Sequence, residues 1–515
     1  MPRGIRASVN GQAPLVLHNG ESVPAARLTE LPLEGFITWV REAVAGGAAI
    51  VAFFALPRPG ARSSGGRYFL QAVLADHSAG TLSTAVAPVD ASWQSLTPHC
   101  TAAGWFEREI WEQWNIVPEG HPWLKPIRFQ PSFPGARPGR AQPAVGDTTF
   151  FELGGEETHE VAVGPVHAGV IEPGHFRFLC HGETVLHLEI SLGYQHRGVE
   201  RSLSAGPDLR SIHYAETLSG DTTIGHATAY CEAVEALARC PVPPRAQAIR
   251  AIALELERIA NHVGDLGALA GDVGFLPTSS WCGRIRGDVL NATAMLCGSR
   301  FGRRLVRPGG VGFDLDEGLV ERLRERLRTC ARDAAGACDL LWRTPSVIAR
   351  FEGAGTLTAA QAADIGLTGP AARACGLERD VRGSFPTGLW RFAQLPVTTW
   401  KTGDVFARAY VRWLETQRSF AFIDDQLGAL PNGPVSAPVG PLARSSFAVA
   451  MVEAWRGAAC HVVQTDAAGR FQRYKVVDPS FRNWFGLAVA MRGQPVSDFP
   501  LCNKSFNLSY CGHDL

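Results

Sequence analysis

The chain has 515 residues, of which 46% are hydrophobic and 19% charged, enough apolar material for a sizeable core and more than one domain. Lysine plus arginine and aspartate plus glutamate each number 49, and this zero net charge argues against a nucleic-acid-binding protein. The 12 cysteines form no CxxC pair and are expected to be buried free thiols in a reducing cytoplasm.

The sequence predicts no membrane-spanning helix. Basic residues in segment 1–6 are followed by no apolar run of the kind that makes a signal peptide. The longest apolar stretch, 43–56, is interrupted by Gly46 and Gly47 and is too short to cross a bilayer. Any membrane association is therefore expected to come through partner subunits.

Residues 1–130 predict a small α/β domain. Segment 36–45 is expected to be a helix, and the short apolar runs 48–56 and 68–74, bounded by Gly, Pro and Ser, are typical of strands. Segment 105–116 predicts an aromatic amphipathic helix, which a Gly-His-Pro turn follows. Helix and strands in alternation indicate an α+β organisation.

Residues 131–146 are rich in Pro and Gly and predict an extended linker. The remaining residues, 147–515, predict a mainly α-helical bundle with a small antiparallel sheet at one end. The sheet is expected within 161–203, where tight turns would present His167 and His175. The bundle is indicated by apolar stripes at helical spacing in segments 249–266, 323–334 and 406–414.

Several motifs resemble one protein family, in the same order along the chain. The pair FEREIWEQWNI (106–116) and EGHPWL (119–124) resembles the 30-kDa subunit of respiratory complex I, in which this segment serves docking and not catalysis. The later motifs resemble the 49-kDa subunit of complex I and the large subunit of membrane-bound group 4 nickel–iron hydrogenases: RGVE (197–200), FEGAGTL (351–357), EAWRGAACH (453–461) and DPSFRNWFGLAVAMRGQPVSDFPL (478–501). The chain thus looks like a fusion of the two subunits.

The resemblance implies a metal cradle whose ligands have been replaced. The hydrogenases hold nickel and iron with four cysteines in two CxxC pairs, because soft thiolates donate strongly to these metals. Matching the helix start at His226 places the first pair on Ser219 and Thr222, and matching the C-terminal segment places the second on Ser509 and Gly512. We expect these two segments to meet in a buried pocket that forms no nickel–iron centre.

The complex I side of the resemblance implies a quinone site made by a tyrosine and a histidine. The position of the tyrosine is Gly220 in this chain, so that residue is missing. The histidine belongs to the turn of the small sheet, where His167 or His175 could stand in, and the sequence does not choose between them.

Three further polar residues are candidates for the pocket or for a proton relay: Glu172, His226 and Arg456. In the hydrogenases a glutamate of the sheet turn relays protons and an arginine caps the metals, and Glu172 and Arg456 match those positions. A buried arginine beside carboxylates is equally expected as a structural ion pair. Another reading has Cys511 as part of a zinc-like site with His513, Asp514 or Asp221.

The resemblance implies the large subunit of a membrane-associated respiratory oxidoreductase complex. Such a subunit would dock an iron–sulfur small subunit resembling the B subunit of complex I, and membrane-embedded antiporter-like subunits, on the cytoplasmic side of the inner membrane. The chain itself is expected to bind no resident cofactor, since the iron–sulfur cluster belongs to the partner, with a quinone as candidate ligand. A non-catalytic scaffold or coupling subunit, and a hydrogenase with unconventional ligands, are the alternatives.

Overall fold

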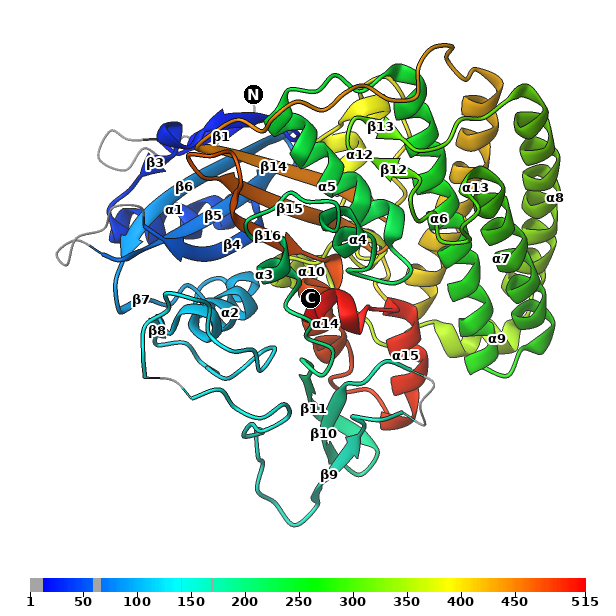
Figure 1. The fold of residues 1–515 in the computed structure, drawn as a ribbon. Helices are drawn as coiled ribbons and strands as arrows, with labels where there is room; N and C mark the ends of the chain where they lie inside the picture. The colour runs from blue at the N-terminus through cyan, green and yellow to red at the C-terminus, as the bar shows by residue number, and fades with distance from the viewer. Residues whose placement is uncertain (1–12, 59–65, 140, 168–170) are drawn as a thin grey trace.

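The computed structural model describes residues 13–58, 66–139, 141–167 and 171–515 (Figure 1). Residues 1–12, which begin the predicted N-terminal domain, lie outside the described part. So do residues 59–65 of the same domain, residue 140 of the predicted linker, and residues 168–170, which follow His167 in a predicted turn. No helix within the described residues has the length and apolar character needed to cross a membrane.

The N-terminal region folds as an α/β unit around one sheet. The antiparallel order is β1 (Leu15–Leu17), β6 (Thr81–Val89), β5 (Tyr68–Asp76) and β4 (Ala49–Pro57), with β3 (Thr29–Glu30) parallel to β6 and α1 (Leu33–Ala45) packed on the sheet. The predicted helix and both predicted strands are present. All of β4 except its last residue is buried, because it also contacts α2 (Gly104–Trp114) and β16 (Phe471–Val477). A strand covered on both faces is apolar throughout and does not alternate.

A second sheet lies at the centre of the molecule and was not predicted. Strands β14 (Ser446–Ala454), β15 (Gly457–Thr465) and β16 form an antiparallel meander, and β2 (Ser22–Pro24) from the N-terminal region completes it beside β14. Helix α5 (Thr223–Ala238) packs on β14 and β15 (Figure 1). Every residue of β14 and β15 is buried, so these strands lack the alternation that reveals a half-buried strand.

The helical bundle consists of α6 (Pro244–Asp272), α7 (Leu276–Cys297), α8 (Glu317–Trp342) and α13 (Val405–Gly428), which stand side by side in Figure 1. The stripe 249–266 is buried along α6, and Leu323, Leu327 and Cys330 are buried on α8, as their spacing predicts.

The small sheet is present as predicted, in the order β11 (Thr184–Ser191), β10 (His175–His181), β9 (Thr158–Val163). The C-terminal helices α14 (Pro479–Ala490), α15 (Phe499–Phe506) and α16 (Tyr510–Asp514) lie between this sheet, the central sheet and the bundle (Figure 1). The shorter elements are β7 (Ser92–Gln94), β8 (Val117–Glu119), α3 (Val199–Leu203), α4 (Ser211–Glu216), β12 (Val306–Arg307), β13 (Gly310–Val311), α9 (Pro345–Phe351), α10 (Ala359–Ile365), α11 (Gly369–Arg373), α12 (Val381–Ser384) and the 3-10 turns η1 (Ala25–Arg27), η2 (Thr101–Ala103), η3 (Gly388–Arg391) and η4 (Val496–Asp498).

Helix α2, expected from the resemblance to be a docking element, docks within the chain itself. Its buried Glu109 accepts from Lys475 of β16 at 2.6 Å and pairs with Arg128. Lys475 also reaches Glu200 of α3 at 2.9 Å, and Arg473 reaches the same carboxylate at 2.9 Å. Because each buried charge has a partner of opposite sign, this buried ion cluster joins the N-terminal helix to the central sheet.

Candidate functional site

The two segments that carry the replaced cysteine positions meet in the structure. Ser219 lies in the turn before α5, and Ser509 is the residue that caps the N-terminus of α16. The Ser219 hydroxyl donates to the Ser509 Oγ at 2.9 Å, and the same Ser509 oxygen accepts from the backbone N–H of Gly512 at 2.9 Å. Both serines are buried. We call the site formed by Ser219, Thr222, Ser509 and Gly512 the cradle.

Arg456 closes the cradle from the hairpin between β14 and β15. Its guanidinium binds both carboxylate oxygens of Asp221, at 2.5 and 2.8 Å, and contacts the hydroxyls of Ser219 and Thr222, each at 3.3 Å. The guanidinium also stacks over the Trp455 ring, 3.8 Å from its centre. Burial alone would raise the pKa of Asp221, but the adjacent guanidinium outweighs burial and lowers it. The ion pair is therefore charged at neutral pH.

The cradle does not fit a nickel–iron centre. Its side chains offer three hydroxyls and no thiolate, and the oxygens of Ser219 and Ser509 touch each other directly, leaving no space for an ion between them. The guanidinium of Arg456 adds a positive charge within hydrogen-bonding distance of two of those hydroxyls. Hydroxyls of high pKa beside a cation cannot replace thiolates as ligands of soft metals.

The residues considered for a zinc-like site are each engaged elsewhere. Burial raises the pKa of Cys511 to about 11, so it is a thiol at neutral pH. His513 bonds Asp514 at 2.8 Å and stacks on Phe481, while Asp514 accepts from backbone N–H groups of the loop before α3. Asp221 is held by Arg456. Among the residues that the structure describes, no group of three or more His, Cys, Asp or Glu side chains is placed to hold a metal ion.

His226, in the first turn of α5, belongs to a chain of buried polar side chains. Two other members, His461 and Asp478, lie in quoted motifs, but neither was a candidate site residue. Its Nε2 lies 2.8 Å from Asp478 Oδ2, and its Nδ1 lies 3.1 Å from Nε2 of His461 on β15. Nδ1 of His461 in turn lies 2.7 Å from the hydroxyl of Tyr474 on β16. Strands β15 and β16 supply two of these residues, so overlooking the central sheet also concealed their proximity to His226.

A cavity of about 390 Å³ lies beside the cradle, between the small sheet and α15. Its lining is mainly aromatic and aliphatic, and includes His167, Phe176, Tyr510, Asn503 and Lys504. The segment from Asn507 to Tyr510 leads from this cavity into the cradle, since Ser509 lies within it. An apolar cavity with a few polar groups is the usual form of a small-molecule site.

The two histidines of the small sheet have different surroundings. His167 lines the cavity and its Nε2 lies 2.9 Å from the carbonyl oxygen of Gly174. His175 is not among the cavity-lining residues described, and its ring packs against Phe150. The structure therefore places His167, and not His175, at this cavity.

Glu172 and Gly220 flank the cradle. A carboxylate oxygen of Glu172 accepts from the backbone N–H of Tyr510 at 3.2 Å, one residue from Ser509. Gly220 is exposed, and a Cβ added there meets no atom within 4 Å, so space for the missing tyrosine side chain begins at this residue.

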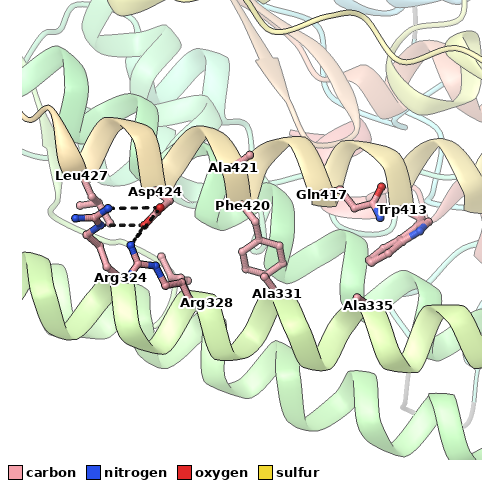
Figure 2. A pocket seen from close by; sticks show the side chains of 11 residues that line it. Arg324, Arg328, Ala331, Ala335, Trp413, Gln417, Phe420, Ala421, Asp424 and Leu427 are labelled. Carbon is pink, nitrogen blue, oxygen red and sulfur yellow. Dashed lines mark hydrogen bonds and ion pairs between the residues drawn. The ribbon is translucent and has the colours of Figure 1, made fainter.

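A second hollow of about 320 Å³ runs between α8 and α13, away from the cradle (Figure 2). Its floor is apolar, with Leu327 and Phe420, and one end carries Asp424 paired with Arg324 and Arg328. Of its described lining residues, none is a predicted site residue.

Comparisons with known proteins agree with the fold and the motifs. Residues 62–148 match the family model of the 30-kDa subunit of respiratory-chain NADH dehydrogenase, and residues 272–445 match that of its 49-kDa subunit. The chain belongs to the family of large subunits shared by complex I-like oxidoreductases and membrane-bound hydrogenases.

Relatives from both branches of this family match most of the chain. The carbon monoxide-induced hydrogenase of Rhodospirillum rubrum is 33% identical over 68% of this chain and 97% of its own length. Formate hydrogenlyase subunit 5 of Escherichia coli K12 is 30% identical over 81% of this chain and 76% of its own. NADH-quinone oxidoreductase subunit 4 of Thermus thermophilus is 30% identical over 66% of this chain and 90% of its own.

A solved structure shares the fold. A chain of the archaeal membrane-bound sulfane sulfur reductase, a respiratory membrane complex, superimposes with a TM-score of 0.65 at 24% identity, over 70% of this chain and 99% of that one.

Proposed function

We propose that this chain is the large subunit of a peripheral, membrane-associated oxidoreductase complex and couples electron transfer to ion translocation without a nickel–iron centre. An iron–sulfur small subunit would deliver or withdraw electrons beside the cradle. This chain would lie on the cytoplasmic side of the inner membrane, in contact with antiporter-like membrane subunits that would move the ions. The observation that carries the proposal is the cradle, where hydroxyl groups in direct contact, with the Arg456–Asp221 ion pair beside them, stand at positions that the resemblance assigns to thiolates.

Support for a redox substrate comes from the cavity next to the cradle. Its volume, its aromatic lining and the imidazole of His167 suit a planar head group with carbonyl oxygens, such as that of a quinone. A histidine can donate a hydrogen bond to a quinone oxygen and supply a proton when that oxygen is reduced.

Metal analysis of the purified complex tests the absence of nickel and iron in this subunit. The expected result is iron that the cluster-bearing partner accounts for, together with a nickel content near zero and no hydrogen uptake with methyl viologen as acceptor. Stoichiometric nickel would contradict the proposal and favour a hydrogenase with unconventional ligands.

A matched pair of histidine variants tests the cavity. His167→Ala is expected to weaken binding of a short-chain quinone, followed by quenching of tryptophan fluorescence, by about tenfold, the effect of one lost hydrogen bond to a buried ligand. His175→Ala serves as control, because this residue lies outside the described cavity lining. Equal affinities for both variants would remove the quinone from the proposal.

A non-catalytic scaffold is the second candidate, and the closed state of the cradle favours it. Arg456 and Asp221 satisfy each other, as structural ion pairs do. Arg456→Lys, assayed in the assembled complex, separates the two functions. Unchanged turnover with normal assembly would favour the scaffold, whereas lost turnover with normal assembly would favour the redox subunit.

A further inference from the structure

The chain of side chains behind the cradle has the geometry of a proton conductor. Asp478, His226, His461 and Tyr474 are linked by contacts of 2.8, 3.1 and 2.7 Å. All four residues are at least 99% buried, so bulk water does not reach them directly. Each link joins two groups that can both donate and accept, except the ionised carboxylate, which only accepts.

The protonation of three members follows from their surroundings. Burial lowers the pKa of His461 well below its ordinary value and raises that of Tyr474 well above its ordinary value. His461 is therefore a neutral imidazole, and Tyr474 keeps its proton. Burial opposes ionisation of Asp478, but the hydrogen bonds from His226 and Ser480 and the nearby positive charge of Arg456 together outweigh burial and lower the pKa of Asp478, which is a carboxylate.

With His226 neutral, one arrangement satisfies every link. Tyr474 O–H donates to Nδ1 of His461, His461 Nε2–H donates to Nδ1 of His226, and His226 Nε2–H donates to Asp478. Adding one proton reverses the first two links. His226 then carries protons on both nitrogens and donates through Nδ1 to His461, whose Nδ1–H donates to the oxygen of Tyr474. Such reversal is how a proton moves along a chain without moving the side chains.

The carboxylate end of the chain faces the cradle. A Cβ built on Gly512 would lie 2.8 Å from Cγ of Asp478, so the carboxyl group stands where a side chain at position 512 would begin. The tyrosine end lies further along α5, where Tyr474 stacks on Tyr230, one helical turn beyond His226.

We propose that Asp478, His226, His461 and Tyr474 form a proton relay between the cradle and the hydroxyl of Tyr474. In each passage toward the cradle, the Tyr474 O–H bond breaks as the His461 Nδ1–H bond forms. His461 Nε2 then gives its proton to His226 Nδ1, and His226 Nε2 gives its proton to Asp478, so one proton enters at Tyr474 and one arrives at Asp478. Both imidazoles then carry their proton on Nδ1, and each returns to its Nε2–H form before the next passage. The relay rests on the cradle being the working pocket of the proposed function.

Hydrogen–deuterium exchange of the His226 ring proton tests the relay in the full chain without relying on turnover. The probe is D₂O, read by nitrogen-15 magnetic resonance of chain labelled in its histidine rings. Tyr474→Phe and His461→Gln each interrupt the chain, and both are expected to slow exchange by about 10²-fold, the lower end of what a positioned proton-transfer group contributes. Tyr230→Phe is the matched control, because its ring stacks on Tyr474 but its hydroxyl is not one of the relay's links.

Circular dichroism and thermal melting verify that each variant is folded, and if one unfolds, the other decides. Unchanged exchange in the folded variants would overturn the relay, because the His226 proton would then exchange without passing through His461 and Tyr474. Exchange in the unmodified chain that is no faster than global unfolding would overturn it as well. A complex that contains nickel would contradict the proposed function yet leave this exchange measurement unaffected, so the two failures are distinguishable.

Discussion

The hydroxyl groups of Ser219 and Ser509, 290 residues apart in sequence, form a hydrogen bond of 2.9 Å at two positions that the sequence resemblance assigns to metal-binding cysteines. This contact joins the turn before α5 to the cap of α16. The cradle, predicted from the resemblance as a former metal site, is thus held together in this chain by oxygen–oxygen contacts and one ion pair.

A double-mutant cycle measures this contact. Ser219→Ala and Ser509→Ala are expected to couple by about 1 kcal/mol in the free energy of unfolding, the usual net value of a buried hydrogen bond. Ser509→Ala alone should cost more than Ser219→Ala, because Ser509 also caps the backbone N–H of Gly512. Denaturant unfolding of the full chain provides the values, and strictly additive effects would contradict the contact.

Gly512 and Gly220 form a matched pair for testing how tightly the cradle is filled. Gly512→Ala is expected to lower stability by about 1–3 kcal/mol, the usual cost of overpacking, because its Cβ would approach Cγ of Asp478 to 2.8 Å. Gly220→Ala should change stability little, since no atom lies within 4 Å of the added Cβ. The shift in thermal midpoint gives the comparison, and equal shifts would show that the carboxyl group can move aside.

Lys475 tests the buried ion cluster that joins α2 to the central sheet. Lys475→Met removes a cation that contacts Glu109 at 2.6 Å and Glu200 at 2.9 Å, and is expected to cost about 3–5 kcal/mol because two buried carboxylates lose a partner. The control is Arg284→Met, which removes exposed ion pairs with Asp288 and Asp333 and should cost about 1 kcal/mol or less. Chemical denaturation measures both. A small effect at Lys475 would mean that water enters the cluster.

The buried carboxyl group of Glu232 is expected to make the stability of the chain depend on pH. Burial raises its pKa to about 7 from the ordinary 4.5, so the folded state holds this proton more tightly than the unfolded chain. The loss of folding stability caused by ionising Glu232 is absent below pH 4.5, grows as the pH rises toward 7 and is constant above pH 7. Glu232→Gln keeps the acceptor for the Thr387 hydroxyl and removes the charge, so it is expected to stabilise the chain by about 3 kcal/mol at pH 8 and not at pH 4.5. Melting temperatures at the two pH values provide the test, and a pH-independent difference would contradict it.

The helices and the N-terminal sheet could be predicted because their apolar residues have clear spacing or clear boundaries. The stripe of α6 is one example, and β4, bounded by Gly47 and Pro57, is another. The central sheet could not be predicted in this way, since β14 and β15 are buried on both faces and rich in alanine. Short apolar runs of that kind do not distinguish a strand from a buried helix.

The candidate site was predicted unevenly for the same reason. Ser219, Thr222, Ser509 and Gly512 could be located because their neighbours resemble a known pattern. The closeness of His461 and Tyr474 to His226 could not be predicted, although His461 ends a quoted motif. It arises from strand pairing between β15 and β16 and from the packing of α5 on the sheet. The two histidines are 235 residues apart in sequence, and a local sequence pattern does not predict contacts over such a separation.

Strand β2 belongs to the first 30 residues of the chain, yet it forms the edge of the central sheet next to β14. Severing the backbone within 131–146 would therefore not release an independent N-terminal fragment. The two pieces would remain a non-covalent heterodimer, held by strand pairing at one end and by Lys475 at the other. A large fragment prepared without residues 22–24 would present an unpaired strand edge, which invites association with other chains.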